Sequence, residues 1–293
     1  MPKIQRTAPK KKAPPKKKKI THESAKQGIL STVHSLSDGL PESGIKINIY
    51  GQSGTGKTTF WGTFPGRILA LVCSGNDQPG ELRSLLGPDT KDKVDYIVVE
   101  DSSQLLEIIE EVQDSDLYET VVLDHLSGLQ DMILVEVLSL KERPVQLSWG
   151  IAKQEQWGEV ANLVKHRLRS LLNLTTNVVI VAQERAFDFD EEDDSVLMPY
   201  VASGVTPSIV GWLNPAVDYI VQTYKQQNQV EKITKLKGKT VKKMVPGEGV
   251  EYRMRIGPHS VFTTKFRKPK GGELPQSIID PTYDKVMEYI TGT

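Results

Sequence analysis

The sequence has little cysteine, no long apolar run and no net charge. Cys73 is the single cysteine among 293 residues, which excludes an internal disulfide and a cysteine-based zinc site and favours a reducing compartment. No apolar run approaches the roughly 18–20 residues that span a bilayer. The N-terminus is charged and no apolar segment follows it, so we expect no secretory signal. Together these absences predict a cytoplasmic protein that is not inserted in a membrane.

The absence of net charge conceals a strong segregation. The chain has 37 basic and 37 acidic side chains. Residues 1–20 carry nine basic side chains and no acidic one, whereas residues 21–224 carry 14 basic and 30 acidic ones. Residues 225–270 are basic again, with 13 basic against 3 acidic side chains. Two basic segments attached to an acidic body predict a polyanionic partner, such as nucleic acid.

The composition divides the chain into three parts. Residues 1–22 are rich in Lys and Pro and lack an apolar period, which predicts a disordered basic arm. Hydrophobic residues make up 38% of the chain, enough for a core, and we place that core in residues 23–224. We expect residues 225–293 to form a small basic β-hairpin extension and a C-terminal helix. Six acidic residues within positions 188–194 predict a solvated, mobile loop inside the core.

Short apolar runs alternate with amphipathic stretches between residues 44 and 183. We expect strands at residues 45–50, 68–73, 95–100, 119–124 and 177–183. We expect helices at residues 58–63, 102–112 and 156–172. Because these strands are apolar throughout, they predict an α/β fold in which helices cover both faces of a mostly parallel sheet.

The C-terminal third indicates antiparallel structure instead. A further strand is expected at residues 217–224. Residues 225–268 alternate basic with apolar or Thr residues, and turn signals at 237–239, 246–249 and 257–258 predict a series of hairpins. Asp280-Pro281 is expected to cap a final helix. The inward side of that helix is predicted to carry Tyr283, Val286, Met287 and Ile290.

A glycine-rich motif stands between the first predicted strand and the first predicted helix. It matches G-x-x-x-x-G-K-[ST] in full, with Gly51, Gln52, Ser53, Gly54, Thr55, Gly56, Lys57 and Thr58. Glycines let the backbone aim successive N–H groups at phosphate oxygens, and the helix N-terminus adds positive charge. We expect Lys57 to reach the β- and γ-phosphates, Thr58 to ligate Mg²⁺ and Thr59 to contact the α-phosphate. The alternative is a glycine-rich surface turn before an ordinary helix.

Besides the P-loop, a nucleotide site of this kind needs an acidic residue that holds the water shell of the magnesium ion. Asp124 ends the predicted strand Thr120-Val121-Val122-Leu123-Asp124 and fits this Walker B role. Its alternative role is to cap the following turn. His125 follows directly, and we expect it to serve packing rather than catalysis.

At these motifs the sequence resembles RecA-like P-loop ATPases, and more narrowly the phage-encoded single-strand-annealing ATPases of the Sak group. The resemblance is carried by segments 45–60, 120–129, 177–185 and 264–275. It implies a RecA-like ATPase that binds ATP and Mg²⁺ and assembles into a ring or filament. It also implies single-stranded DNA binding and annealing in phage recombination or replication, in the host cytoplasm, with a single-strand-binding protein as a further partner.

The resemblance also assigns roles to three residues outside the P-loop. Gln183, at the end of its strand, would sense the γ-phosphate. Its alternative is a polar strand end without such a role. Lys265 and Arg267 resemble a finger pair that enters the nucleotide site of a neighbouring subunit, where a cation stabilises charge on the transferring phosphoryl group. Their alternative is a basic hairpin that faces nucleic acid or solvent.

Two departures from the family pattern qualify these roles. RecA-like ATPases have a catalytic Glu after the second strand, whereas this chain has Gly75 near that position. Asp77 and Glu81 are the nearest acids. Either is a candidate to orient the attacking water, and Asp77 is the candidate catalytic acid. Neither is in the expected register, which predicts slow hydrolysis. The loop after Gln183 binds DNA in such recombinases, but here residues 188–194 are acidic and are expected to bind the basic arm when DNA is absent.

Two other functions fit the same motifs. One is a motor, either a DnaB-like helicase or a packaging ATPase, and the other is a nucleotide-gated loader or regulator that acts through protein partners. Within the basic regions, the aromatic residues are expected to stack bases where they are exposed and otherwise to form the core of a small sheet. They are Tyr224, Tyr252, Phe262 and Phe266.

Overall fold

The computed structural model describes residues 43–73, 79–139, 152–187, 199–236, 239–268 and 273–292. Ser43–Thr293 forms one compact unit of the chain. The predicted arm, the acidic loop 188–194 and Asp77 lie outside the described residues. Within the part that the structure describes, no helix is long and apolar enough to cross a membrane.

A nine-stranded sheet organises this unit, with the strand order β11-β9-β8-β1-β5-β4-β2-β3 and β10 paired to β8. The five strands that the sequence predicts are β1 (Lys46–Gly51), β2 (Ile68–Val72), β3 (Val94–Val98), β4 (Thr120–Asp124) and β5 (Asn177–Ala182). All of them pair in parallel with their neighbours, and β1 also pairs in parallel with β8. The prediction of a largely parallel α/β sheet is therefore confirmed.

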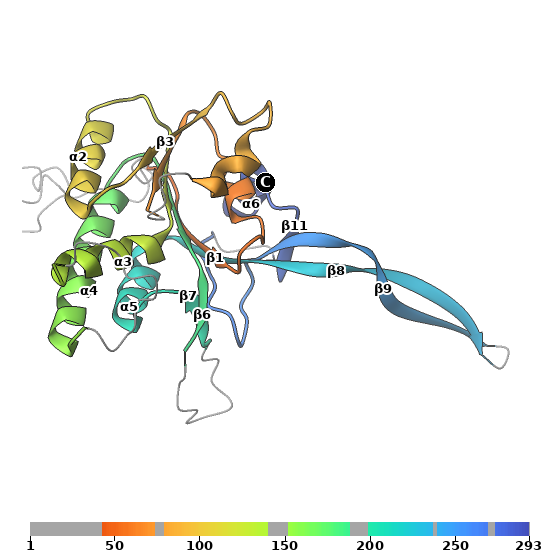
Figure 1. Ribbon diagram of the computed structural model, residues 1–293. Helices are drawn as coiled ribbons and strands as arrows, with labels where there is room; N and C mark the ends of the chain where they lie inside the picture. The colour runs from red at the N-terminus through yellow and green to blue at the C-terminus, as the bar shows by residue number, and fades with distance from the viewer. Residues whose placement is uncertain are drawn as a thin grey trace, which may run out of the picture. The chain divides into compact units, whose positions relative to one another are not determined.

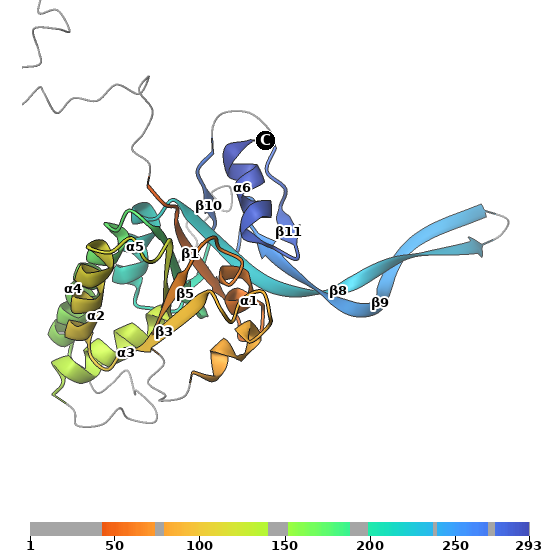
Figure 2. The same cartoon turned by 90° about the horizontal axis from the view of Figure 1, so that it is seen from above.

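Helices cover both faces of the sheet, as Figures 1 and 2 show. One core lies between the sheet and α2 (Ser102–Gln113), α3 (Leu126–Val137), α4 (Gln154–Leu172) and α5 (Pro207–Ala216). The other lies on the side of α1 (Lys57–Trp61), the 3₁₀ helix η4 (Gly80–Leu85) and α6 (Tyr283–Thr291). Successive residues of one strand enter opposite cores, as Val121 and Val122 of β4 do. This two-sided burial explains why the strands are apolar throughout.

Two helices and a small sheet were not expected from the sequence. The His125 Nδ1 atom caps α3 by accepting a hydrogen bond from the Gly128 N–H at 2.9 Å. The start of α3 lies close to the residue that follows β2, because a Cβ at Gly128 would lie 2.0 Å from the Cys73 carbonyl oxygen. Pro207 opens α5 at a position where its missing N–H costs nothing.

Strands β6 (Glu184–Ala186) and β7 (Val201–Ser203) form a two-stranded antiparallel sheet.

The antiparallel structure predicted for residues 225–268 is confirmed, but one long hairpin takes the place of the predicted series. Strand β8 (Tyr219–Leu236) pairs antiparallel with β9 (Lys239–Arg255), and both extend beyond the sheet in Figures 1 and 2. The predicted turn at 246–249 lies inside β9, opposite a register shift between Gln227 and Gln229. Such an irregularity accommodates a Pro that cannot donate to the ladder. The predicted boundary between residues 224 and 225 falls inside β8, which joins the parallel sheet to the hairpin.

The C-terminal residues return to the sheet. Strand β11 (Ser277–Ile279) pairs with β9, and α6 follows it. The helix cap is Thr282 rather than Asp280-Pro281, because the Thr282 hydroxyl accepts from the Lys285 N–H at 3.3 Å. Val286 of α6 is buried as predicted. Strand β10 (Lys265–Phe266) pairs with the start of β8.

Candidate nucleotide site

The P-loop lies between β1 and α1, as the motif requires. Gly54 and Gly56 have φ angles of 71° and 89°, in the left-handed region where side chains with a Cβ are strained. The Lys57 ammonium donates to the carbonyl oxygens of Gly51 and Gln52 at 2.8 and 2.7 Å. The Thr55 hydroxyl bonds that of Thr223 on β8 at 2.7 Å. The loop is thus held to a neighbouring strand before any phosphate binds.

The Lys57 side chain is only 8% exposed. Burial lowers the pKa of its ammonium, and the negative charges of Asp124 and Glu184 partly oppose that shift. A buried cation whose bonds go to neutral carbonyls is incompletely compensated. Phosphate oxygens would offer it stronger, charge-assisted partners.

A cavity of about 880 Å³ opens at the P-loop. It brings together the predicted residues Lys57, Thr58, Asp124 and Gln183. The sheet order explains this meeting, because β5 lies between β1 and β4. Gln183 follows β5 and is therefore located between the P-loop and Asp124, at the carboxyl edge of the parallel strands.

Asp124 is 4% exposed, and its Oδ2 atom has no hydrogen-bond partner among the described residues. Burial raises the pKa of this carboxyl to about 6, and the nearby charge of Glu81 adds to the shift. The Trp61 indole and the Lys57 ammonium lower the pKa, although the indole N–H makes no hydrogen bond of normal geometry. An orphaned buried carboxylate oxygen fits the water shell of a magnesium ion.

The cavity offers a hydroxyl and a carboxylate, Thr58 and Asp124, which are oxygen donors of the kind that Mg²⁺ takes. The described residues contain no cluster of three His, Cys, Asp or Glu side chains. Mg²⁺ is usually held by one or two protein oxygens, by water and by the substrate phosphates. Thr58 and Asp124 are the residues that would hold it here.

Glu81 also lines the cavity, from the 3₁₀ helix η4 that packs on α1. Its Oε1 atom is buried and has no hydrogen-bond partner among the residues described. Sequence reasoning left the choice between Asp77 and Glu81 open, because neither residue matches the family register. The sequence did not predict the helix η4 that carries Glu81, because its six residues are too few to show a helical period.

Gln183 is half-buried and adjoins a polar network at the base of the hairpin. The Gln222 amide donates to Glu184 at 3.1 Å and accepts from the Arg255 guanidinium at 2.5 Å. That guanidinium lies 4.4 Å from the ring centroid of Tyr224 and 4.3 Å from that of Phe262. These two rings are therefore engaged within the fold.

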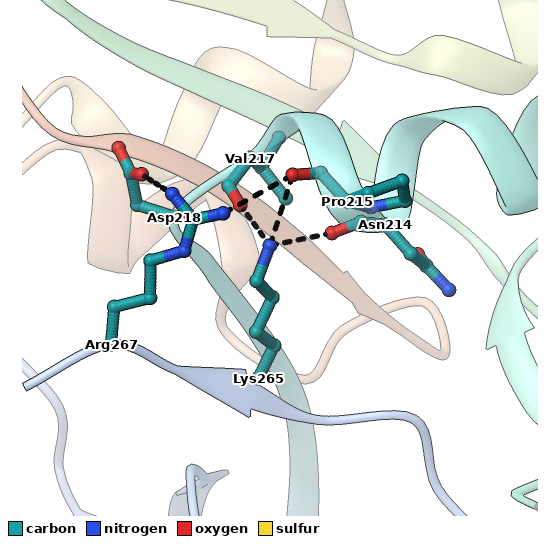
Figure 3. Close-up of polar contacts among 6 residues, drawn as sticks. All are labelled: Asn214, Pro215, Val217, Asp218, Lys265 and Arg267. Carbon is teal, nitrogen blue, oxygen red and sulfur yellow. Dashed lines mark hydrogen bonds and ion pairs between the residues drawn. The ribbon is translucent and has the colours of Figure 1, made fainter. Parts of the chain in front are cut away.

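Lys265 and Arg267 contact their own chain, as Figure 3 shows. The Lys265 ammonium donates to three carbonyl oxygens at the end of α5. They belong to Asn214, Pro215 and Val217, at 2.9, 3.1 and 2.6 Å. The Arg267 guanidinium pairs with Asp218 at 2.8 Å. Cations near the carbonyl end of a helix stabilise it, and Lys265 does so here. A finger role in a neighbouring subunit stays a prediction.

Comparison with known proteins places most of this unit in a family. The model of the AAA domain family matches residues 43–267. No curated protein matches the chain. The match includes the P-loop, Asp124 and Gln183, whereas β11 and α6 lie beyond it. The chain therefore belongs to the AAA domain family, whose P-loop ATPase-type domains bind nucleotide.

Proposed function

We propose that the protein is a Mg²⁺-dependent, RecA-like ATPase that binds single-stranded DNA and promotes its annealing, as the Sak-group resemblance implies. The observation that carries its ATPase part is the convergence of Lys57, Thr58, Asp124 and Glu81 on one cavity. These are a phosphate-binding cation, a hydroxyl, a buried carboxylate for the metal and a second carboxylate. Phosphoryl transfer needs little more than such positioned charges.

Binding would exchange the partners of Lys57. In the structure its ammonium bonds two loop carbonyls, Gly51 and Gln52. On binding, the β- and γ-phosphates would take their place, while Mg²⁺, held at Thr58 and through water at Asp124, would neutralise the developing charge. Gln183, between these groups, would sense the γ-phosphate.

Hydrolysis would use Glu81 to orient the attacking water. Its Oε1 atom is buried and has no hydrogen-bond donor among the residues that the structure describes, and a water molecule would supply one. We expect Glu81→Gln to retain nucleotide binding and to lower kcat by about 100-fold or more. Ser84→Ala, on the same η4 helix and also at the cavity, is the matched control, and its kcat should stay near that of the wild type. An unchanged kcat in Glu81→Gln would remove Glu81 from the mechanism.

The DNA-binding part rests on charge and on the hairpin. Beyond residue 224, strands β8 and β9 carry eight of the 13 basic residues of 225–270, and both strands extend past the sheet. Basic side chains bind phosphates without reading sequence. Strand β8 also bonds the P-loop through Thr223, so a nucleotide-dependent change in the loop would reach the hairpin.

ATPase and annealing assays with the wild type and Lys57→Ala test this function. We expect low ATP turnover and annealing that requires ATP. Lys57→Ala should lose both the turnover and the ATP-dependent annealing. Strong stimulation of turnover by single-stranded DNA would instead identify a motor. An absence of DNA binding at low salt would contradict the proposal and leave a nucleotide-gated regulator.

Assembly is the remaining part of the proposal. Fingers at Lys265 and Arg267 would act only between subunits, in a ring or filament, and would have to leave their contacts with α5. Sedimentation with and without ATP and DNA tests for such an assembly. A monomer under every condition would contradict it.

A further inference from the structure

The cavity extends past the phosphate-binding groups to a second side. Asp124 and Gln183 line it on the β5 and β4 side of the P-loop. On the opposite side, beyond β8, it is lined by Tyr252 of β9 and by Asp280, Pro281 and Thr282. The last three residues lie outside the range that the family model matches. This second side has no role in the phosphate chemistry described above.

Tyr252 differs from the other aromatic residues of the hairpin base. Tyr224 and Phe262 pack against Arg255, and Phe266 packs against Tyr219 at 5.0 Å between ring centroids. Tyr252 is 43% exposed, yet its Cδ1 atom lies only 3.4 Å from the position that a Cβ at Gly56 would occupy. An aromatic face is therefore open to the cavity directly beside the P-loop.

The loop opposite Tyr252 is held in place by both of its neighbours. The Asp280 N–H donates to the Tyr252 carbonyl oxygen at 2.8 Å. The Tyr283 N–H donates to the Thr63 hydroxyl of the turn after α1 at 2.8 Å. The ring of Tyr283 lies 4.8 Å from that of Phe64. The loop is thus fixed at the end of α1, without a ligand.

We propose that Tyr252 and Asp280 form the nucleobase subsite of this cavity. The inference rests on the proposed nucleotide binding. With the γ-phosphate end toward Gln183 and Asp124, the nucleoside end lies toward β9 and the 280–282 loop. The Tyr252 ring stacks on a purine, and the Asp280 carboxylate, which only accepts hydrogen bonds, takes one from an exocyclic amino group.

The test compares a ligand that has a base with one that lacks it. Wild-type protein and Tyr252→Ala are titrated with Mg·ATP and with Mg·tripolyphosphate, which occupies only the phosphate end. We expect Tyr252→Ala to weaken ATP binding by about tenfold and to leave tripolyphosphate binding unchanged. Tyr252→Phe retains the ring and should bind ATP like the wild type. Tyr96→Ala removes a comparably exposed Tyr on β3, outside the cavity lining, and is the matched control.

The outcomes separate this inference from the proposed function. If neither ligand binds the wild type, the proposed function fails. If both bind and Tyr252→Ala weakens neither, or weakens both equally, the subsite is wrong while the function stands. Melting temperatures of all variants establish that each is folded.

The amino group is tested with three nucleotides in wild type and Asp280→Asn. ATP and GTP each carry an exocyclic amino group and ITP carries none. We expect either ATP or GTP to bind the wild type about fivefold more tightly than ITP does. Asp280→Asn should reduce this ratio of affinities. Whichever binds more tightly identifies the base. Equal binding of all three to the wild type would overturn the role of Asp280.

Discussion

At the scale of single residues, the buried carboxyl group of Asp124 lowers the stability of the fold when it is ionised. It is a buried acid that lines the cavity, and its pKa is raised from 3.8 to about 6. The folded chain therefore binds this proton more tightly than the unfolded chain does. The free energy of unfolding must then fall as the pH rises from about 4 to about 6, and the loss remains above that window.

The same cost predicts how the stability of Asp124→Asn depends on pH in the absence of nucleotide and magnesium. At pH 7 the variant should be more stable than the wild type by about 1–2 kcal/mol, because a neutral amide avoids the buried charge. At pH 4 the two should be equally stable. Urea unfolding across this range measures the difference. A difference that is independent of pH, or a variant less stable at pH 7, would contradict the assignment of the shift to Asp124.

At the scale of elements, β10 fastens the end of α5 to the start of β8. The Lys265 ammonium bonds three carbonyls there, and burial lowers its pKa. The Arg267–Asp218 pair is more open, with side-chain exposures of 56% and 33%. A partly buried cap should contribute more to stability than an exposed ion pair does.

We therefore expect Lys265→Met to lower the free energy of unfolding of the nucleotide-free chain by about 1–3 kcal/mol. Arg267→Gln should lower it by less than about 1 kcal/mol. Chemical unfolding of both variants measures this order. If Lys265→Met keeps full stability but loses ATPase activity in the assembled state, the finger role is the correct one and the contact with α5 is not important.

The hairpin also reaches the P-loop through Lys225, which pairs with Tyr252 across β8 and β9. The Lys225 ammonium lies 3.6 Å from the position of a Cβ at Gly54. Because this cation is next to the phosphate end, Lys225→Ala should weaken ATP and tripolyphosphate alike, by about two- to fivefold. Calorimetric titration with both ligands tests this. A loss confined to ATP would move Lys225 to the nucleoside end.

At the scale of the whole molecule, one basic segment, residues 1–20, lies outside the unit that contains the cavity, and the other, residues 225–270, lies within it. Ser43–Thr293 contains the cavity, and the nine basic residues of 1–20 lie outside this unit. Replacing the eight Lys residues of 1–20 with Gln should leave ATP affinity unchanged. It should also flatten the salt dependence of single-stranded DNA binding by roughly 0.7 per lost phosphate contact. Binding isotherms at several salt concentrations measure that slope. An unchanged slope would assign DNA binding to the hairpin alone.

The sequence by itself determined the features of the protein that depend on residues close together along the chain. The P-loop is a run of eight positions whose chemistry and backbone needs are local, so Lys57 and Thr58 were identified from the motif. The five buried strands were predicted because burial on both faces makes each run continuously apolar. Asp124 was identified because it ends such a strand, whereas Gln183 was named from the resemblance to RecA-like ATPases.

Only the tertiary structure decided what depends on residues far apart in the chain. Glu81, Tyr252 and Asp280 meet the P-loop from η4, β9 and the loop before α6, and their separations from Lys57 carry no period. The hairpin length was missed because a Pro-Gly turn signal is local, whereas pairing with β8 accommodates it as an irregularity within β9. The contacts of Lys265 with carbonyls at the end of α5 were also not predictable, because a sequence pattern carries no information about groups about 50 residues away.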